Sequence, residues 1–187
     1  MGMPQAPTQW TAAAVRDLPD DGLRYELVDG ELLVTPAPSW IHQGVAAVLF
    51  RRIDTWLTTS RVGIIRFSPA DIALGEDEIL QPDLFVVPVG DHAPIRTWTD
   101  ITRLLLAIEI LSPSTARFDR LLKRRRYQRA GVPEYWIVDP DARLVERWRP
   151  EDTRPEVVGE ILAWQPDSSY PALEIDLAAM FAEAWGT

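Results

Sequence analysis

The chain of 187 residues contains no cysteine, no asparagine, one lysine and two histidines. Without cysteine there can be no disulfide and no thiolate metal ligand, so any bound metal ion must be held by oxygen or imidazole. No segment is long and apolar enough to cross a membrane, and the first residues lack the charged leader and apolar core of a signal peptide. We therefore expect a cytoplasmic protein of bacterial type with no membrane partner.

Lysine is nearly absent although arginine is abundant, since 18 arginines accompany Lys123. The missing asparagine points the same way, to a genome whose base composition disfavours Lys and Asn codons. A lysine retained under this bias indicates a position that needs a compact ammonium group, which fits beside a phosphate and a water where a guanidinium does not. The alternative is an ordinary surface lysine that was left over.

The net charge of -9 argues against nonspecific binding to nucleic acid, which usually requires a basic surface. Charge is unevenly placed, however, because residues 117–129 carry seven positive side chains and one acid. Such a local basic ridge on an acidic body could contact phosphates, through Arg117, Arg120 and Arg124. The alternative is a solvated helix face paired with acidic loops or with a partner subunit.

The length and the apolar fraction of 47% predict one globular domain over residues 1–187, with residues 1–9 disordered. Its centre is an apolar strand, 104–111, that carries one acid, Glu109. A helix over about 115–130 follows, stopped by Gly131, and then a second apolar strand, 134–138. A strand, helix, strand unit predicts two parallel neighbours joined by a right-handed crossover.

Three polar side chains of the predicted helix, Asp119, Lys123 and Tyr127, are spaced four residues apart and so share one stripe. A second acid, Asp83, stands after Pro82 at the mouth of a short buried strand, 84–87. It is either a turn residue or one half of a pair with Glu109. Two carboxylates close together in a low-dielectric site repel unless a cation or proton lies between them, and a hard ion such as Mg²⁺ suits them best.

Two further segments supply candidate residues. Asp29-Gly30 between apolar runs predicts a hairpin of residues 25–28 and 31–35, which places Glu26 and Glu31 on one face. They either help to hold a metal or a water, or belong to an exposed hairpin face. A helix capped by Ser39 and running to about residue 59 carries His42 near its start, as a catalytic residue or as a hydrogen-bonded core histidine.

The remaining elements complete the expected order. They are a helix over 11–18 capped by Thr11, strand-like runs at 63–68, 70–74, 143–148 and 157–164, a loop over 92–99, and a final helix over 177–185 capped by Asp176.

Three stretches together, YELVDGELLV, QPDLFVV and AIEILSPST followed by D, K, Y and GVPEYWIVDP, resemble the Uma2 family of restriction endonucleases, a branch of the PD-(D/E)XK nuclease superfamily. The likeness spans about residues 25–148. It implies an α/β (α+β) fold, a restriction-endonuclease-like mixed β-sheet flanked by helices. In that superfamily the catalytic lysine normally follows the second acid by two residues, where this chain has Leu111; Uma2-like sequences place it on the following helix, which matches Lys123.

The resemblance implies a metal-dependent endonuclease that hydrolyses phosphodiester bonds in DNA. Asp83 and Glu109, with the carbonyl of Ile110, would bind Mg²⁺ or Mn²⁺, and Lys123 would assist the attacking water. Glu26 or Glu31 would add a ligand through water, and Asp119 or Tyr127 would hold Lys123. A homodimer is expected from the resemblance alone.

A rival hypothesis is a noncatalytic binding or dimerisation module that kept the nuclease fold, and it is favoured by the acidic net charge and the displaced lysine. Action on RNA or on single strands is a third possibility.

Overall fold

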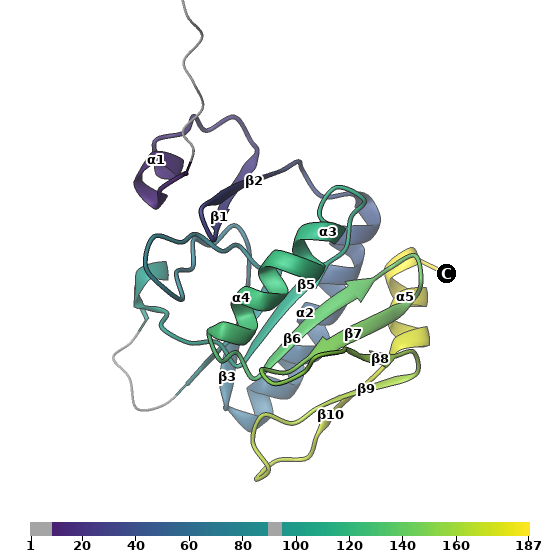
Figure 1. The fold of residues 1–187 in the computed structure, drawn as a ribbon. Helices are drawn as coiled ribbons and strands as arrows, with labels where there is room; N and C mark the ends of the chain where they lie inside the picture. Colours follow the sequence, from purple (N-terminus) through teal and green to yellow (C-terminus); the bar gives the residue numbers. More distant parts are fainter. Residues whose placement is uncertain (1–8, 90–94) are drawn as a thin grey trace, which may run out of the picture.

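The computed structural model describes residues 9–89 and 95–187, which form a mixed sheet covered by helices on both faces (Figure 1). The sheet has the order β3-β4-β5-β6-β7-β8. Its strands are β3 (Gly63–Phe67), β4 (Leu84–Pro88), β5 (Leu106–Ile110), β6 (Glu134–Asp139), β7 (Leu144–Trp148) and β8 (Glu156–Val158). Strands β5 and β6 are parallel and the other neighbours antiparallel, so the expected α/β fold and crossover unit are confirmed.

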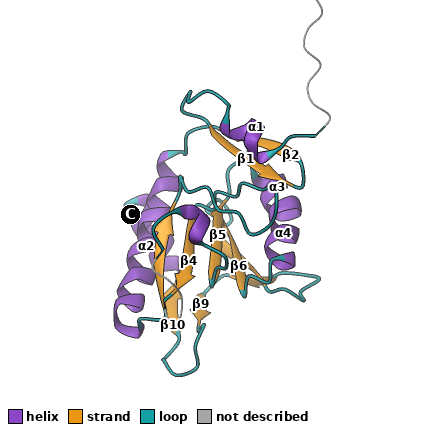
Figure 2. Ribbon diagram, turned by 90° about the vertical axis from the view of Figure 1, so that its left-hand side faces the viewer, coloured by secondary structure: helices purple, strands orange, loops and turns teal. Residues whose placement is uncertain are grey.

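The central strands are apolar on both faces because helices bury both. On one face Leu84, Val86 and Ile108 pack against α2 (Trp40–Ser60) and α5 (Leu177–Trp185). On the other, Phe85 and Ala107 pack under a helical segment made of α3 (Ala116–Phe118), the π turn η2 (Asp119–Lys123) and α4 (Arg124–Arg129). Figure 2 shows the resulting three layers, with α2 and α4 on opposite sides of the sheet. This double burial explains the continuous apolar runs in the sequence.

The predicted helix starts are confirmed by their capping hydrogen bonds. Ser39 accepts from the backbone N–H of His42 at 3.3 Å at the start of α2. Asp176 accepts from Ala179 at 2.9 Å at the start of α5, and Thr11 caps the short α1 (Ala12–Arg16). Each cap satisfies a donor that the first helical turn leaves without a partner.

The predicted hairpin is also confirmed, as β1 (Arg24–Val28) and β2 (Glu31–Thr35). Asp29 and Gly30 both adopt positive φ, 52° and 79°, as a two-residue turn of this kind requires. Leu27 and Ile79 exchange backbone hydrogen bonds of 2.8 and 3.1 Å, which fix the hairpin to the segment that leads into β4. The hairpin therefore lies over one end of the central sheet (Figures 1 and 2).

Several expectations differ from the structure. Residues 70–74 form no strand, only an isolated bridge between Ile72 and Leu80. The run 157–164 is divided between β8 and β9 (Ile161–Trp164), and β9 pairs with an unpredicted strand, β10 (Leu173–Asp176). A short 3-10 turn over Trp98–Asp100 overlaps the end of the expected loop 92–99. The first part of that loop is outside the described residues, as are residues 1–8 of the segment expected to be disordered. Within the described ranges, no helix is long and apolar enough to span a membrane.

Candidate functional site

The register of β4 and β5 brings the two predicted acids to the same end of the sheet. Leu84 is directly opposite Ile108 in this antiparallel pair, so Asp83, one residue earlier, comes level with Glu109, one residue later. Residues opposite each other across antiparallel strands project from the same face. The Oδ2 atom of Asp83 also accepts a hydrogen bond of 2.8 Å from the backbone N–H of Ile110. Two acids 26 positions apart in the sequence thus become neighbours.

Lys123 is fully buried at the centre of three carboxylates. Its Nζ lies 2.8 Å from Oε2 of Glu26, 3.0 Å from Oε1 of Glu109 and 3.5 Å from Oδ1 of Asp119. Its side chain is 2% exposed and those of the three acids 1–3%, so it is not a leftover surface residue. Tyr127 donates to Glu109 Oε1 at 3.3 Å from one turn further along. The helix therefore supplies the lysine that the strand itself lacks, and we name Glu26, Glu109, Asp119 and Lys123 the lysine cage.

A π turn positions the helical members of the lysine cage. The backbone N–H of Arg124 donates to the carbonyl of Asp119, five residues earlier, and the Tyr135 hydroxyl donates to the same carbonyl at 3.1 Å. The turn Asp119–Lys123 is wider than an α-helical turn, yet both of its end side chains stay buried. Such single π turns recur at functional sites. The expected helical stripe exists, but through this widened turn and not through a regular α-helix.

Two side chains, Arg24 and His42, contact the carboxylate of Asp83. Arg24 Nη1 donates to Oδ1 at 2.8 Å, and His42 Nε2 lies 3.0 Å from Oδ2. Burial alone would raise the pKa of Asp83, but the hydrogen bond from His42 and the charges on His42 and Arg24 outweigh it and hold the pKa well below its usual range. Sequence reasoning missed Arg24. Its position two residues before Glu26 on the same strand, which puts both on one face, is the signal that could have identified it.

Three groups of the lysine cage have shifted pKa values. Burial raises the pKa of Glu109 well above its usual value, although the Lys123 ammonium opposes the shift, and it raises the pKa of Asp119 in the same way. Burial disfavours the charged form of Lys123 too, but Glu109, Glu26 and Asp119 outweigh it and raise its pKa. Together with Asp83, the three acids of the lysine cage make four carboxyl groups, which face two cationic side chains, Lys123 and Arg24. The carboxyl groups outnumber these cations, so the site can take up a further cation or protons.

A hard divalent cation fits this donor set. Around Asp83 and Glu109 the side-chain atoms that could bind a metal are carboxylate oxygens, the Tyr127 hydroxyl and the His42 imidazole, and oxygen is what Mg²⁺ prefers. Asp119 Oδ1 is buried and accepts no hydrogen bond from a described residue, and the Lys123 ammonium lies 3.5 Å from it. Within residues 9–89 and 95–187, no three His, Asp or Glu side chains form a ready-made cage, because Lys123 occupies the space between three of the acids. Asp83 and Glu109 would therefore be the primary protein ligands.

Glu31 is the one predicted carboxylate that does not reach the site. It lies opposite Val28, on the same face as Glu26 as predicted, but at the hairpin tip, where it is exposed. Glu26 instead is 1% exposed and also accepts from the backbone N–H of Gln81 at 2.8 Å. The hairpin therefore contributes one acid to the site.

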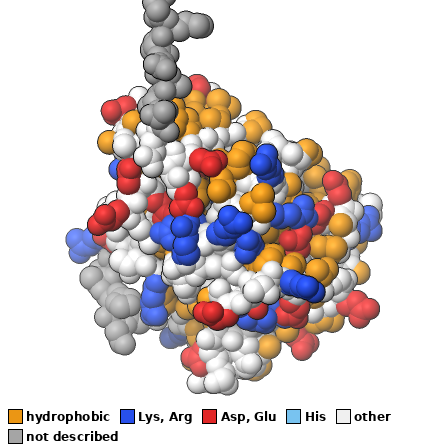
Figure 3. Space-filling view, in the orientation of Figure 1, with side chains coloured by type: hydrophobic (Ala, Val, Ile, Leu, Met, Phe, Trp, Pro, Cys, Tyr) orange, Lys and Arg blue, Asp and Glu red, His pale blue; other side chains and the backbone are white. Residues whose placement is uncertain are grey.

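The predicted basic ridge is largely paired within the molecule. Arg120 contacts Asp139 at 3.2 Å and Glu146 at 2.7 Å, and the Arg124 guanidinium lies over the Trp148 ring, 4.6 Å from its centre. Arg117 is exposed and has no salt bridge with any described residue. Figure 3 shows basic side chains gathered across the middle of the face that α3 and α4 cover, interspersed with acidic ones. The ridge thus combines internal ion pairs with cations free to meet an anion.

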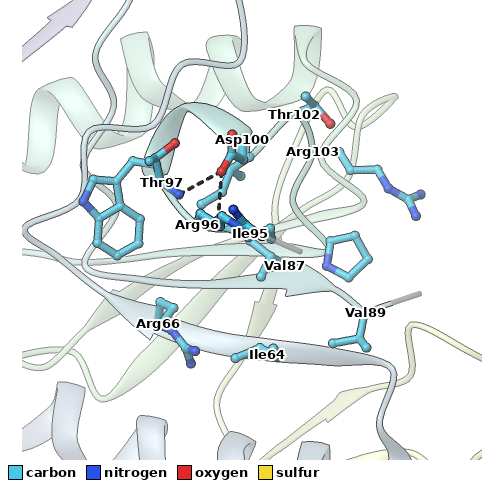
Figure 4. Close-up of a pocket in the computed structure, with 13 residues that line it drawn as sticks. Ile64, Arg66, Val87, Val89, Ile95, Arg96, Thr97, Asp100, Thr102 and Arg103 are labelled. Carbon is cyan, nitrogen blue, oxygen red and sulfur yellow. Dashed lines mark hydrogen bonds between the residues drawn. The ribbon is translucent and has the colours of Figure 1, made fainter. Parts of the chain in front are cut away.

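Among the cavities that described residues line, two adjoin the sheet, and the smaller of these two lies at the candidate site. It has a volume of about 500 Å³, and Arg24, His42 and Asp83 are among its lining residues. The larger one, about 1220 Å³, is at the other end of β4, around Val87, Val89 and Trp98 (Figure 4). None of the predicted site residues lines it. Of these two cavities, the smaller one is therefore the one that predicted site residues line.

Comparison with known proteins agrees with this picture. A family model described as "Uma2: Putative restriction endonuclease" matches residues 12–178. Among solved structures, a "putative nuclease belonging to DUF820" from Anabaena variabilis matches with a TM-score of 0.75 at 19% identity, over 94% of this chain and 99% of that chain. At this identity the likeness concerns the fold. The comparison with curated proteins gave no match. Because the family model covers most of the chain, the protein belongs to the Uma2 family, as its sequence motifs predicted.

Proposed function

We propose that the protein is a Mg²⁺- or Mn²⁺-dependent endonuclease that hydrolyses phosphodiester bonds in DNA. The observation that carries this proposal is the meeting of Asp83, Glu109 and Lys123 from three separate segments, with the Lys123 ammonium 3.0 Å from Glu109. Family membership supports a nuclease. A homodimer and a cytoplasmic location stay predictions.

Each residue has a separate part in the proposed reaction. Asp83 and Glu109 would hold the cation, which supplies a more acidic water and offsets charge on the scissile phosphate. Lys123 would orient the attacking water with its N–H groups, and Glu26 and Asp119 would keep the ammonium charged and in place. Tyr127 would fix the Glu109 carboxylate through its hydroxyl.

Closed circular DNA tests the activity, because only an endonuclease can open it. We expect the wild-type protein to convert supercoiled plasmid or circular single-stranded DNA to linear fragments in Mg²⁺ or Mn²⁺, and to leave both intact in EDTA. Gel electrophoresis measures the conversion. An Asp83→Ala protein purified in the same way controls for contaminating nuclease. Equal cleavage by that variant, or no cleavage of either circle by the wild type, would refute the proposal.

Arg117 is the best candidate for a phosphate contact on the ridge, because it is exposed and has no salt bridge with a described residue. Each lost phosphate contact reduces the slope of log K against log salt concentration by about 0.9. We expect this change for Arg117→Ala, measured by fluorescence anisotropy of labelled DNA over a salt series in Ca²⁺. Arg129→Ala is the matched control, because Arg129 is also exposed but is paired with Asp29. An unchanged slope for Arg117→Ala would exclude this contact.

A further inference from the structure

The side chains around Asp83 are more exposed than those of the lysine cage. The lysine cage is 1–3% exposed, whereas Asp83 is 6%, His42 13% and Arg24 21% exposed. These three residues are among those that line the cavity of about 500 Å³. Pockets of roughly 300–1,000 Å³ hold groups of small-molecule size. A substrate of the proposed nuclease would therefore meet the site at this cavity.

Phe67 forms an exposed aromatic wall of that cavity. It is the last residue of β3, the edge strand, and it lies opposite Leu84, the residue that follows Asp83. Its side chain is 60% exposed. Phe50 from α2 contacts it edge-on, with ring centres 5.5 Å apart and an interplanar angle of 75°. The ring is thus supported from the protein side while most of its surface faces solvent, next to the proposed metal ligand.

The charges around Phe67 favour the phosphate backbone of a nucleic-acid strand. Arg51, which also lines the cavity, shares the single carboxylate of Glu183 with Arg52, so one positive charge there is unbalanced. Arg24 also lines the cavity, where its guanidinium is paired with Asp83. An aromatic side chain beside cationic ones is the combination on which proteins stack the bases of single strands.

We propose that this cavity is a base-stacking subsite in which Phe67 receives an unpaired base adjacent to the scissile phosphate. A base inside an intact duplex is covered on both faces by its neighbours and cannot stack on Phe67. The preferred substrate is therefore a strand with an unpaired base, a chemistry shared by single-stranded DNA and RNA. The inference rests on the proposed function for its position at the reacting phosphate.

Binding measured without cleavage tests the subsite. We expect fluorescence anisotropy in Ca²⁺ to give tighter binding of a 12-nucleotide single strand than of its duplex. Phe67→Ala should weaken single-strand binding about 5- to 150-fold and leave duplex binding unchanged, and Phe67→Trp should retain it. An abasic strand should bind the wild type as weakly as the normal strand binds Phe67→Ala. Parallel DNA and RNA strands show which sugar is preferred, and a Phe67-dependent preference in either supports the subsite.

Val157→Ala is the matched control, because Val157 is also 60% exposed but lies on β8, the strand at the other edge of the sheet. It should change neither affinity. Tighter binding of the duplex, unchanged single-strand binding by Phe67→Ala, or no binding of either single strand would overturn the subsite. A Phe67-dependent preference without cleavage in Mg²⁺ would instead support the subsite and refute the nuclease, so the two failures are distinguishable.

Discussion

The Glu109→Gln variant will cleave circular DNA about 10²- to 10⁴-fold more slowly than the wild type, the range found when a positioned catalytic group is removed. Glutamine keeps the size of the side chain and a carbonyl that can accept from Lys123 and Tyr127. It removes the negative charge that would bind the cation. The loss will therefore appear in the cleavage rate and in Mg²⁺ affinity, while Glu26 and Asp119 keep the Lys123 ammonium paired.

The same variant will change the pH dependence of Mg²⁺ binding. Burial raises the pKa of Glu109, so in the metal-free protein this acid still carries a proton at pH values above its usual pKa. A cation must displace that proton, and Mg²⁺ affinity will therefore rise with pH until Glu109 ionises on its own. Calorimetry at several pH values will show this rise in the wild type and a weaker dependence in Glu109→Gln.

Glu31→Gln is the control for this prediction, because Glu31 is an exposed acid of the hairpin that lies outside the lysine cage. It should retain the wild-type cleavage rate and the wild-type pH dependence. Cleavage by Glu109→Gln within tenfold of the wild-type rate would remove Glu109 from the proposed mechanism.

The Lys123→Met variant will lose about 3–5 kcal/mol of unfolding free energy at neutral pH, the cost of removing one partner from a buried ion pair. Methionine fills similar space but leaves Glu26, Glu109 and Asp119 without a cation. The acids can relieve the repulsion by binding protons. For an acid whose pKa is raised in the folded state, stability falls as pH rises above its pKa in the unfolded chain, so the deficit will shrink in acid.

Urea unfolding with and without Mg²⁺ measures this effect. Mg²⁺ should restore part of the lost stability, because it binds the folded state and replaces the missing positive charge. Cleavage should stay low even in Mg²⁺. Arg125→Met is the control, since Arg125 is exposed on the same helical segment, and we expect it to change stability by less than about 0.5 kcal/mol. Equal stability of Lys123→Met and wild type would show that repulsion among the acids of the lysine cage does not destabilise the fold.

Local patterns were sufficient to predict most elements. The Asp29-Gly30 turn fixed the hairpin register, and the caps at Ser39 and Asp176 fixed two helix starts. These signals depend on neighbouring residues only. Strand β10 does alternate apolar and acidic residues, but the run is only four residues long, and its last residue, Asp176, was interpreted as a helix cap. The break between β8 and β9 was missed because both halves are rich in apolar residues.

The candidate site was predicted less completely because its contacts are long-range. The motifs pointed to Asp83, Glu109 and Lys123, but the antiparallel pairing of β4 with β5 decides that the acids face the same side. Arg24 was missed because its one signal, the spacing of two residues to Glu26, falls at the first residue of the strand, which the predicted hairpin of 25–28 left out. Arg120 pairs with Asp139 and Glu146, which lie on two later strands. The neutralisation of this part of the basic ridge could therefore not be predicted from local sequence.

The position of Lys123 along the chain has a consequence for biosynthesis. Glu26 and Asp83 leave the ribosome first and Glu109 follows, whereas the amine that separates two of these carboxylates emerges about a dozen codons later. Until then Arg24 is the only permanently charged cation of the candidate site, and it faces three carboxylates. Completion of the candidate site must therefore await docking of the helix that carries Lys123, so a growing chain cannot finish it before that helix has been translated.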